Sequence, residues 1–183
     1  MRSRCRIPRS SRIWSVLPAD KIYLVGFMGA GKSSVARALG KRLDWKVEDI
    51  DARIERTERR DIPTIFRVEG EPYFRARERE ALIGLLPERG TVVASGGGTF
   101  ADASNRELML RDGAVIWLDA PLETVLKRIP LDGRRPLAAD RVGMEQLYNQ
   151  RLAAYRLAHL RVDAGRGSVE ELVDHIVEWL DAN

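Results

Sequence analysis

Residues 21–43 read KIYLVGFMGAGKSSVARALGKRL, and this stretch decides the fold. It opens with a β-branched and aromatic run, Lys21–Val25, and continues after residue 33 with apolar residues at the spacing of one helical face. Between the two, residues 26–33 match the pattern G-x-x-x-x-G-K-[ST] of a phosphate-binding loop. A glycine-rich turn containing Lys-Ser by coincidence is the alternative, and the strand and helix on either side argue against it.

The loop predicts an ATP site. Its glycines let backbone N–H groups turn around phosphate oxygens, and the N-terminus of the following helix favours negative charge. Lys32 is expected to reach the β- and γ-phosphates, and the Ser33 hydroxyl to bind Mg²⁺. The predicted ATP contacts in this segment are Gly29, Ala30, Gly31, Lys32, Ser33 and Ser34.

Beyond residue 43, short apolar runs alternate with helical patterns. Strands are predicted at 45–49, 91–95, 114–118 and 160–163, and helices at 63–68, 71–86, 122–129 and 143–158. Ser168 and Glu171 form a capping box that opens a last helix, with Leu172, Ile176 and Leu180 on its inner face. This alternation predicts right-handed βαβ units and a mostly parallel sheet covered on both faces, with ligands at the carboxyl ends of the strands.

Two carboxylates, Asp49 and Asp51, follow the second predicted strand. The period of two in a strand would send both to one side and Ile50 to the other. Beside a phosphate-binding loop, one carboxylate can hold the Mg²⁺ shell while the other orients an attacking hydroxyl and accepts its proton. The alternatives are a solvated acidic turn or the N-cap of the helix that follows.

Three glycines, Gly96, Gly97 and Gly98, follow the strand at 91–95. Ordering such a loop costs chain entropy, so we expect its backbone to approach a ligand closely and to donate N–H groups. A plain flexible loop is the alternative.

Arginines occupy three suggestive places. Arg75 follows an apolar residue on the helix at 71–86, and Arg151 interrupts a stripe formed with Tyr148 and Tyr155. An Arg in such a stripe needs a partner, which a planar carboxylate would satisfy through two hydrogen bonds. Arg134 and Arg135 lie in a polar segment where a cation can swing onto a phosphate. Each of these, taken alone, is more consistent with an internal salt bridge or a solvated side chain.

Composition places the basic charge at one end of the chain. The 183 residues carry a net charge of +4, but residues 1–20 hold five of the 31 basic residues and one of the 27 acidic ones. The remainder is formally neutral, which argues against nucleic-acid binding. Residues 1–20 are expected to be a disordered extension or the product of an upstream start, with organelle import as a lesser alternative. Cys5 is the only cysteine, and a cytoplasmic protein without a membrane span is expected.

Together these blocks resemble the shikimate kinase family. GFMGAGKS is close to that family's own loop, and D-x-D, E-G-E-x-x-F-R, G-G-G, R-P-L and R-x-x-x-Y follow in order, so that the resemblance spans residues 21–180. It implies an α/β, three-layer fold of the nucleoside-monophosphate-kinase type, with a five-stranded parallel sheet. The kinase domain would cover 21–183, with a short lid at about 130–143.

The resemblance also implies an activity and roles for residues. The family transfers the γ-phosphate of ATP to the 3-hydroxyl of shikimate with Mg²⁺, and it is expected to act as a monomer. The implied catalytic residues are Lys32, Asp51 and Arg135. Shikimate would contact Asp51, Arg75, Gly96, Gly97, Gly98 and Arg151; Mg²⁺ would contact Ser33 and Asp49; ATP would also contact Arg128 and Arg135. Because Arg134 adjoins Arg135, which of them reaches the phosphates stays open. The alternatives are a gluconate-kinase-like enzyme and a non-catalytic module that senses shikimate or nucleotide.

Overall fold

The computed structural model describes residues 20–128 and 141–183. In chain order its elements are β1 (Lys21–Val25), α1 (Lys32–Leu43), β2 (Lys46–Asp49), α2 (Ile50–Glu58), α3 (Ile62–Leu85), β3 (Thr91–Ala94), α4 (Ala103–Asp112), β4 (Ala114–Asp119), α5 (Leu122–Arg128), α6 (Arg141–Tyr155), β5 (Leu160–Asp163) and α7 (Val169–Ala182). The predicted tail, apart from Asp20, and most of the predicted lid, with Arg134 and Arg135, lie outside the described residues. Residues 141–143, expected to end the lid, instead form the first turn of α6.

The five strands form one parallel sheet, as predicted, and their order is β2-β3-β1-β4-β5. β1 lies at the centre, where Tyr23 is opposite Val93 on one side and Val115 on the other. All five residues of β1 are buried, because helices cover both faces of the sheet. This double coverage explains why the central strands are unbroken apolar runs rather than alternating ones.

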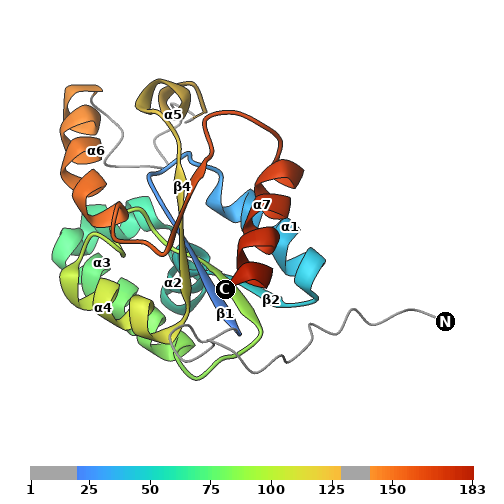
Figure 1. Cartoon of the computed structure of the whole chain (residues 1–183). Helices are drawn as coiled ribbons and strands as arrows, with labels where there is room; N and C mark the ends of the chain where they lie inside the picture. The colour runs from blue at the N-terminus through green and yellow to red at the C-terminus, as the bar shows by residue number, and fades with distance from the viewer. Residues whose placement is uncertain (1–19, 129–140) are drawn as a thin grey trace.

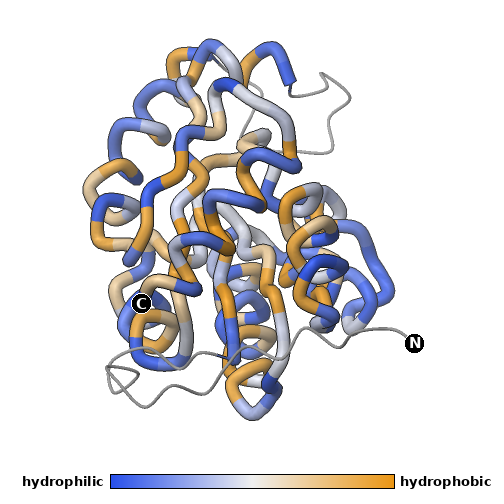
Figure 2. The backbone as a smooth tube through the Cα atoms, turned by 45° about the vertical axis from the view of Figure 1, so that its right-hand side comes forward, coloured by the Kyte–Doolittle hydropathy of each residue, from blue (hydrophilic) through white to orange (hydrophobic). Residues whose placement is uncertain are grey.

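Helices on the two faces give the molecule three layers. α1 and α7 lie together on one face, while α3, α4 and α6 lie on the other (Figure 1). Coloured by hydropathy, the backbone is largely apolar along the central strands β1, β3 and β4 and polar on the outer parts of the helices (Figure 2). The predicted capping box is present at the start of α7, and Ile176 on that helix is fully buried. None of the helices in the described ranges is long and apolar enough to cross a membrane.

Two helices, α2 and α4, were not predicted as elements. Each buries only two side chains, Ile50 and Ile54 in α2 and Asn105 and Met109 in α4, so neither has a long apolar stripe. The two helices expected at 63–68 and 71–86 form α3, which is interrupted at Gly70, where φ is 83°. Gly70 therefore separates the segments, because few other residues adopt this conformation without strain.

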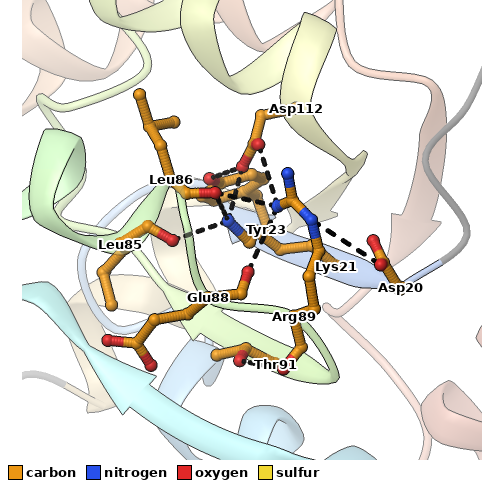
Figure 3. Close-up of polar contacts among 9 residues, drawn as sticks. All are labelled: Asp20, Lys21, Tyr23, Leu85, Leu86, Glu88, Arg89, Thr91 and Asp112. Carbon is orange, nitrogen blue, oxygen red and sulfur yellow. Dashed lines mark hydrogen bonds and ion pairs between the residues drawn. The ribbon is translucent and has the colours of Figure 1, made fainter.

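The amino end of β1 contains a buried ionic network (Figure 3). Lys21 is fully buried, and its Nζ donates to the carbonyl oxygens of Leu85 and Leu86 at 2.6 and 2.9 Å and to Asp112 Oδ2 at 2.7 Å. Tyr23 donates its hydroxyl to the same Asp112 oxygen, and burial raises the pKa of this tyrosine. The network therefore joins the end of α3, the first residues of β1 and the end of α4.

Candidate active site

A cavity of about 490 Å³ opens at the carboxyl ends of β1, β2 and β3, where ligands of parallel sheets are expected to bind. Its walls come from the phosphate-binding loop, the starts of α1 and α2, both segments of α3, the loop after β3, and single residues of α5 and α6. The residues that line it are Met28, Gly29, Gly31, Lys32, Ser33, Ser34, Asp49, Asp51, Glu55, Ile62, Phe66, Phe74, Arg75, Glu78, Ser95, Gly96, Gly97, Gly98, Arg128 and Arg151. Residues predicted separately from six parts of the chain thus share one cavity.

The phosphate-binding loop joins β1 to α1 as predicted. Gly26, Gly29 and Gly31 all have positive φ, and a Cβ on Gly26 would lie 2.5 Å from the carbonyl oxygen of Leu118 in β4. No side chain caps α1 at Gly31, and its first turn contains no acidic residue, so the N-terminus of this helix suits an anion. The sequence of the loop therefore fixes both its shape and its charge preference.

Two predicted ATP contacts behave differently within this loop. Lys32 donates its Nζ to the carbonyl oxygens of Gly26 and Phe27, at 2.9 and 2.8 Å, so its ammonium group folds over the loop. Ala30 is 1% exposed, does not line the cavity, and donates its backbone N–H to Phe27 at 3.2 Å. Its side chain serves packing of the loop, which the motif pattern alone does not reveal.

Asp49 and Asp51 both line the cavity, but the strand geometry predicted for them is wrong. β2 ends at Asp49, which is the N-cap of α2 and accepts from the Ala52 N–H, whereas Asp51 lies in the first helical turn. The N-cap alternative is therefore correct for Asp49. Its other oxygen accepts the Ser33 hydroxyl at 2.8 Å, so the two predicted metal ligands are adjacent.

Arg75 reaches the cavity from α3 and is held by two carboxylates. Its guanidinium pairs with Glu71 at 2.8 Å and with Glu78 at 2.9 Å. Desolvation opposes the charged form of Arg75, but the attraction of Glu78 and Glu71 outweighs it, so the pKa is raised. Glu78 is 1% exposed and accepts a further hydrogen bond from the Thr99 hydroxyl at 2.6 Å. Arg75 is thus fixed in orientation and largely neutralised.

The triple glycine owes its composition to charged side chains rather than to positive φ. A Cβ on Gly96 would lie 2.6 Å from Glu78 Oε1, and one on Gly97 would lie 2.9 Å from Arg151 Nη1. A Cβ on Gly98 would collide with the guanidinium group of Arg75. The loop therefore lets three charged groups from α3 and α6 converge on its backbone, where any larger residue would displace them.

Arg151 lies on α6 as predicted, on the same helical face as two tyrosines, and its side chain is 6% exposed. Its guanidinium carbon lies 5.7 Å from the centre of the Phe27 ring, and the neighbouring Tyr155 donates its hydroxyl to Gly97 O at 2.5 Å. Burial, with the nearby charge of Arg75, lowers the pKa of Arg151. Within residues 20–128 and 141–183, no carboxylate forms an ion pair with it.

Arg128, the remaining predicted ATP contact in the described ranges, ends α5 and lines the cavity while donating to the Ala164 carbonyl oxygen at 3.1 Å. Arg135 lies outside the described residues. The sequence reasoning missed Glu78, Glu55 and the apolar wall formed by Ile62 and Phe66. Glu78 had one available signal, since it lies three residues after Arg75 on the same helix.

Comparison with known proteins agrees with this geometry. A family model described as "Shikimate kinase" matches residues 28–181. The chain is 42% identical to a shikimate kinase of Sulfurihydrogenibium sp. over 157 residues, which are 85% of this chain and 95% of that protein. The chain belongs to the shikimate kinase family.

Solved structures agree with the fold of this shikimate kinase family member. A structure of shikimate kinase from Acinetobacter baumannii in complex with shikimate superposes with a TM-score of 0.85 at 37% identity, covering 90% of this chain and 94% of that one. Deoxyadenosine kinase from M. mycoides, with bound dATP, superposes at 0.61 with 17% identity, covering 88% of this chain and 99% of that one. The second likeness concerns the fold alone and agrees with the expected nucleoside-monophosphate-kinase type.

Proposed function

We propose that this protein transfers the γ-phosphate of ATP to the 3-hydroxyl of shikimate with Mg²⁺, as its family membership implies. The observation that carries the choice of an anionic substrate is Arg151, a buried cation at the cavity without a carboxylate partner among the described residues. Burying an unpaired charge costs several kcal/mol, on the order of 3–5, unless a partner arrives. The substrate carboxylate is the partner that this position requires.

The charge around the two arginines supports a carboxylate at the same place. Glu71 and Glu78 both form ion pairs with Arg75, whereas neither forms one with Arg151. One bound carboxylate, held by Arg151 and by the outer N–H groups of Arg75, would give Arg151 the ion-pair partner that it lacks among the described residues. We therefore assign most of the recognition to Arg151 and assign to Arg75 the orientation of the ring.

Asp51 is assigned to the reacting hydroxyl. It lies in the first turn of α2, close enough to the triple glycine that a Cβ on Gly96 would lie 3.1 Å from its Oδ1. A loose phosphoryl-transfer transition state demands alignment more than a strong base. Asp51 would hold the hydroxyl in line with the γ-phosphate and take its proton late in the transfer.

Ser33 and Asp49 fit a Mg²⁺ site. Protein-bound Mg²⁺ is held by few oxygen ligands and keeps several waters while it contacts substrate phosphates. The Ser33 hydroxyl and Asp49 carboxylate are 2.8 Å apart at the start of α1, beside the phosphate-binding loop. When bound there with ATP, the ion would neutralise charge on the β- and γ-phosphates.

Lys32 and the loop amides would hold the phosphates, and Lys32 would leave the Gly26 and Phe27 carbonyl oxygens to reach the γ-phosphate. Arg128 would contact the adenine, and Arg135 would add a cation from the lid. The resemblance also implies a cytoplasmic monomer. These assignments belong to the proposal.

A coupled assay of ADP release tests the activity. The purified chain, with ATP and Mg²⁺, is supplied in turn with shikimate, gluconate and nucleosides, and the phosphorylated product is identified by mass spectrometry. Shikimate 3-phosphate should form with shikimate alone. Phosphorylation of gluconate or a nucleoside in preference would refute the proposal, and binding of shikimate without turnover would indicate a sensing module.

A further inference from the structure

A second cavity, of about 420 Å³, lies where α6 crosses β4 and β5. Its residues are Trp117, Asp119, Tyr148, Leu152, Tyr155, Arg156, Ala158 and Arg161, none of which lines the first cavity. Its volume falls within the range of roughly 300–1,000 Å³ that is typical of small-molecule sites. It is therefore a separate space, divided from the active site by the helix that carries Arg151.

The aromatic residues of the second cavity also contact the active site. Tyr148 packs edge-on against Phe27 of the phosphate-binding loop, with ring centres 5.2 Å apart. Tyr155 reaches through to the carbonyl oxygen of Gly97. A Cβ on Gly26 would lie 3.4 Å from Cδ1 of Trp117, so the indole packs against the first residue of the loop. Each ring therefore has a partner among the residues around the substrate and the phosphates.

The chemistry of the second cavity selects a type of ligand. The rings of Trp117 and Tyr155 lie with centres 5.9 Å apart and planes tilted by 31°, and they supply an apolar wall. Arg161 lies over Trp117 and pairs with Asp119 at 2.6 Å, so this cation is balanced. Arg156 is exposed and forms no ion pair with any described residue, which leaves the cavity one positive charge in excess. An aromatic wall with an unbalanced arginine suits a small aromatic carboxylate.

We propose that this second cavity binds a small aromatic carboxylate and that its occupation is coupled to shikimate binding through α6. A ligand in this space would restrain Tyr148 and Tyr155 without touching Arg151. Those two rings position Phe27 and the Gly97 backbone beside Arg151. With the rings already restrained by the first ligand, shikimate would lose less conformational entropy in ordering its own site. Occupation should therefore tighten shikimate binding by about fivefold, a modest coupling.

Because the two binding equilibria are linked, the proposed coupling has a sign that can be measured. If benzoate in the second cavity lowers the dissociation constant of shikimate by a given factor, shikimate must lower that of benzoate by the same factor. Benzoate competing for Arg151 in the first cavity would do the opposite, since each ligand would weaken the other. The sign of the coupling thus separates the two places at which an aromatic carboxylate can bind.

The experiment is a pair of titrations followed by NMR. Benzoate is added to the full chain with and without saturating shikimate, and the indole resonance of Trp117, assigned with Trp117→Phe, is observed among those of the four tryptophans. Benzamide lacks the charge and cyclohexanecarboxylate lacks the aromatic ring, so both should bind at least about tenfold more weakly. Arg156→Ala should weaken the binding of benzoate by a similar factor. Arg37 is an exposed arginine on α1, and the matched control Arg37→Ala should leave the binding unchanged.

Several outcomes would overturn the proposal. One is loss of benzoate binding when shikimate is saturating, and another is equal affinity in Arg156→Ala and the control. Benzoate binding that leaves shikimate affinity unchanged would refute the coupling. The coupling rests on the proposed function, because it uses shikimate as the reporter. If the chain bound no shikimate, the proposed function would fail, whereas the benzoate titration of the free protein, mapped with Arg156→Ala and Arg151→Ala, would still decide the site.

Discussion

At the amino end of β1, Lys21 is fully buried and each of its three N–H donors has an acceptor. Across the sheet, near the carboxyl end of the same strand, Arg151 is 6% exposed and forms no ion pair with a described carboxylate. Both ends bury a cation, but only Lys21 forms an ion pair with a carboxylate of the described residues. The balanced cation joins elements of the fold, and the unbalanced one creates a demand for a ligand.

This difference separates a structural charge from a functional one. Burial alone does not distinguish a structural charge from a functional one, because the side chains of Lys21, Glu78 and Arg151 are all almost inaccessible. The direction of a pKa shift does not distinguish them either, since structural ion pairs also shift pKa values. Counting the partners of each buried charge is more informative. If the contrast is real, substitutions at the carboxyl end should act on kinetics and those at the amino end on stability.

The largest effect is expected at the carboxyl end, for Lys32→Ala. Removing this ammonium group should lower kcat by about a thousandfold, or about 4 kcal/mol, because it deprives the transferring phosphoryl group of charge stabilisation. The melting temperature should change little, since the hydrogen bonds of Lys32 to the Gly26 and Phe27 carbonyl oxygens stay within its own loop. Steady-state kinetics and calorimetry measure both, with the exposed Lys41→Ala on the same helix as the control. A kcat within threefold of the native value would contradict the role.

At the amino end, Lys21→Met should act on stability alone. The change leaves the Leu85 and Leu86 carbonyl oxygens without their donor and Asp112 without one of its cations, at a cost of about 3 kcal/mol. Urea unfolding measures the loss, and Lys41→Met controls for the change of residue type. The KM for shikimate should stay within twofold of the native value. A large rise in KM would mean that the two ends of the sheet are not independent.

Arg151 and Arg75 offer a finer test within the carboxyl end. Arg151→Ala should raise the KM for shikimate by about 30-fold, or about 2 kcal/mol, because a charged double hydrogen bond is lost. Its stability should not fall, since no described carboxylate loses a partner and a buried unpaired charge is removed.

Arg75→Ala should instead lose both affinity and stability, because Glu78 would remain buried without its cation. The additional substitution Glu78→Gln should restore part of the stability and none of the affinity. KM and urea unfolding are measured for Arg151→Ala, for Arg75→Ala and for Arg75→Ala combined with Glu78→Gln. Equal stability of Arg151→Ala and Arg75→Ala would contradict the assignment of charge.

The sequence predicted the sheet and most of the cavity, because both depend on local patterns. A strand, a glycine loop and a helix follow each other within residues 21–43, and parallel strands bring their carboxyl ends to one edge. The start of α2 was harder, since Asp49 reads equally well as the end of a strand and as an N-cap. The choice depends on Ile50, which is buried as the first residue of the helix.

The partners of buried charges could not be read from the sequence. Glu78 meets Thr99 across 21 positions, and Tyr155 meets Gly97 across 58. Such contacts follow from packing between elements, for which one sequence carries no local signal. The triple glycine illustrates the limit: its position indicated a close approach, but the approaching groups, Arg75, Arg151 and Glu78, became clear only in three dimensions.

The smallest expected effect concerns pH and again belongs to the amino ends of the strands. His159 precedes β5 and accepts a hydrogen bond at Nδ1 from the Val115 backbone N–H at 3.0 Å, while the backbone N–H of His159 donates to Val115 O at 2.9 Å. Burial lowers the pKa of His159, so the folded chain favours the neutral ring, and protonation would remove the acceptor. The contribution to stability is therefore complete above the unfolded pKa of about 6.5 and is lost as pH falls through the lower folded value.

His159→Gln keeps an acceptor that does not titrate. Between pH 7.5 and 5.5 the native chain should lose stability relative to this variant by at most about 1 kcal/mol, the net value of a neutral hydrogen bond. Urea unfolding at the two pH values measures the difference, and KM at pH 7.5 should be the same for both chains because His159 does not line the substrate cavity. A stability difference independent of pH would mean that Nδ1 is not the acceptor that holds β5 to β4.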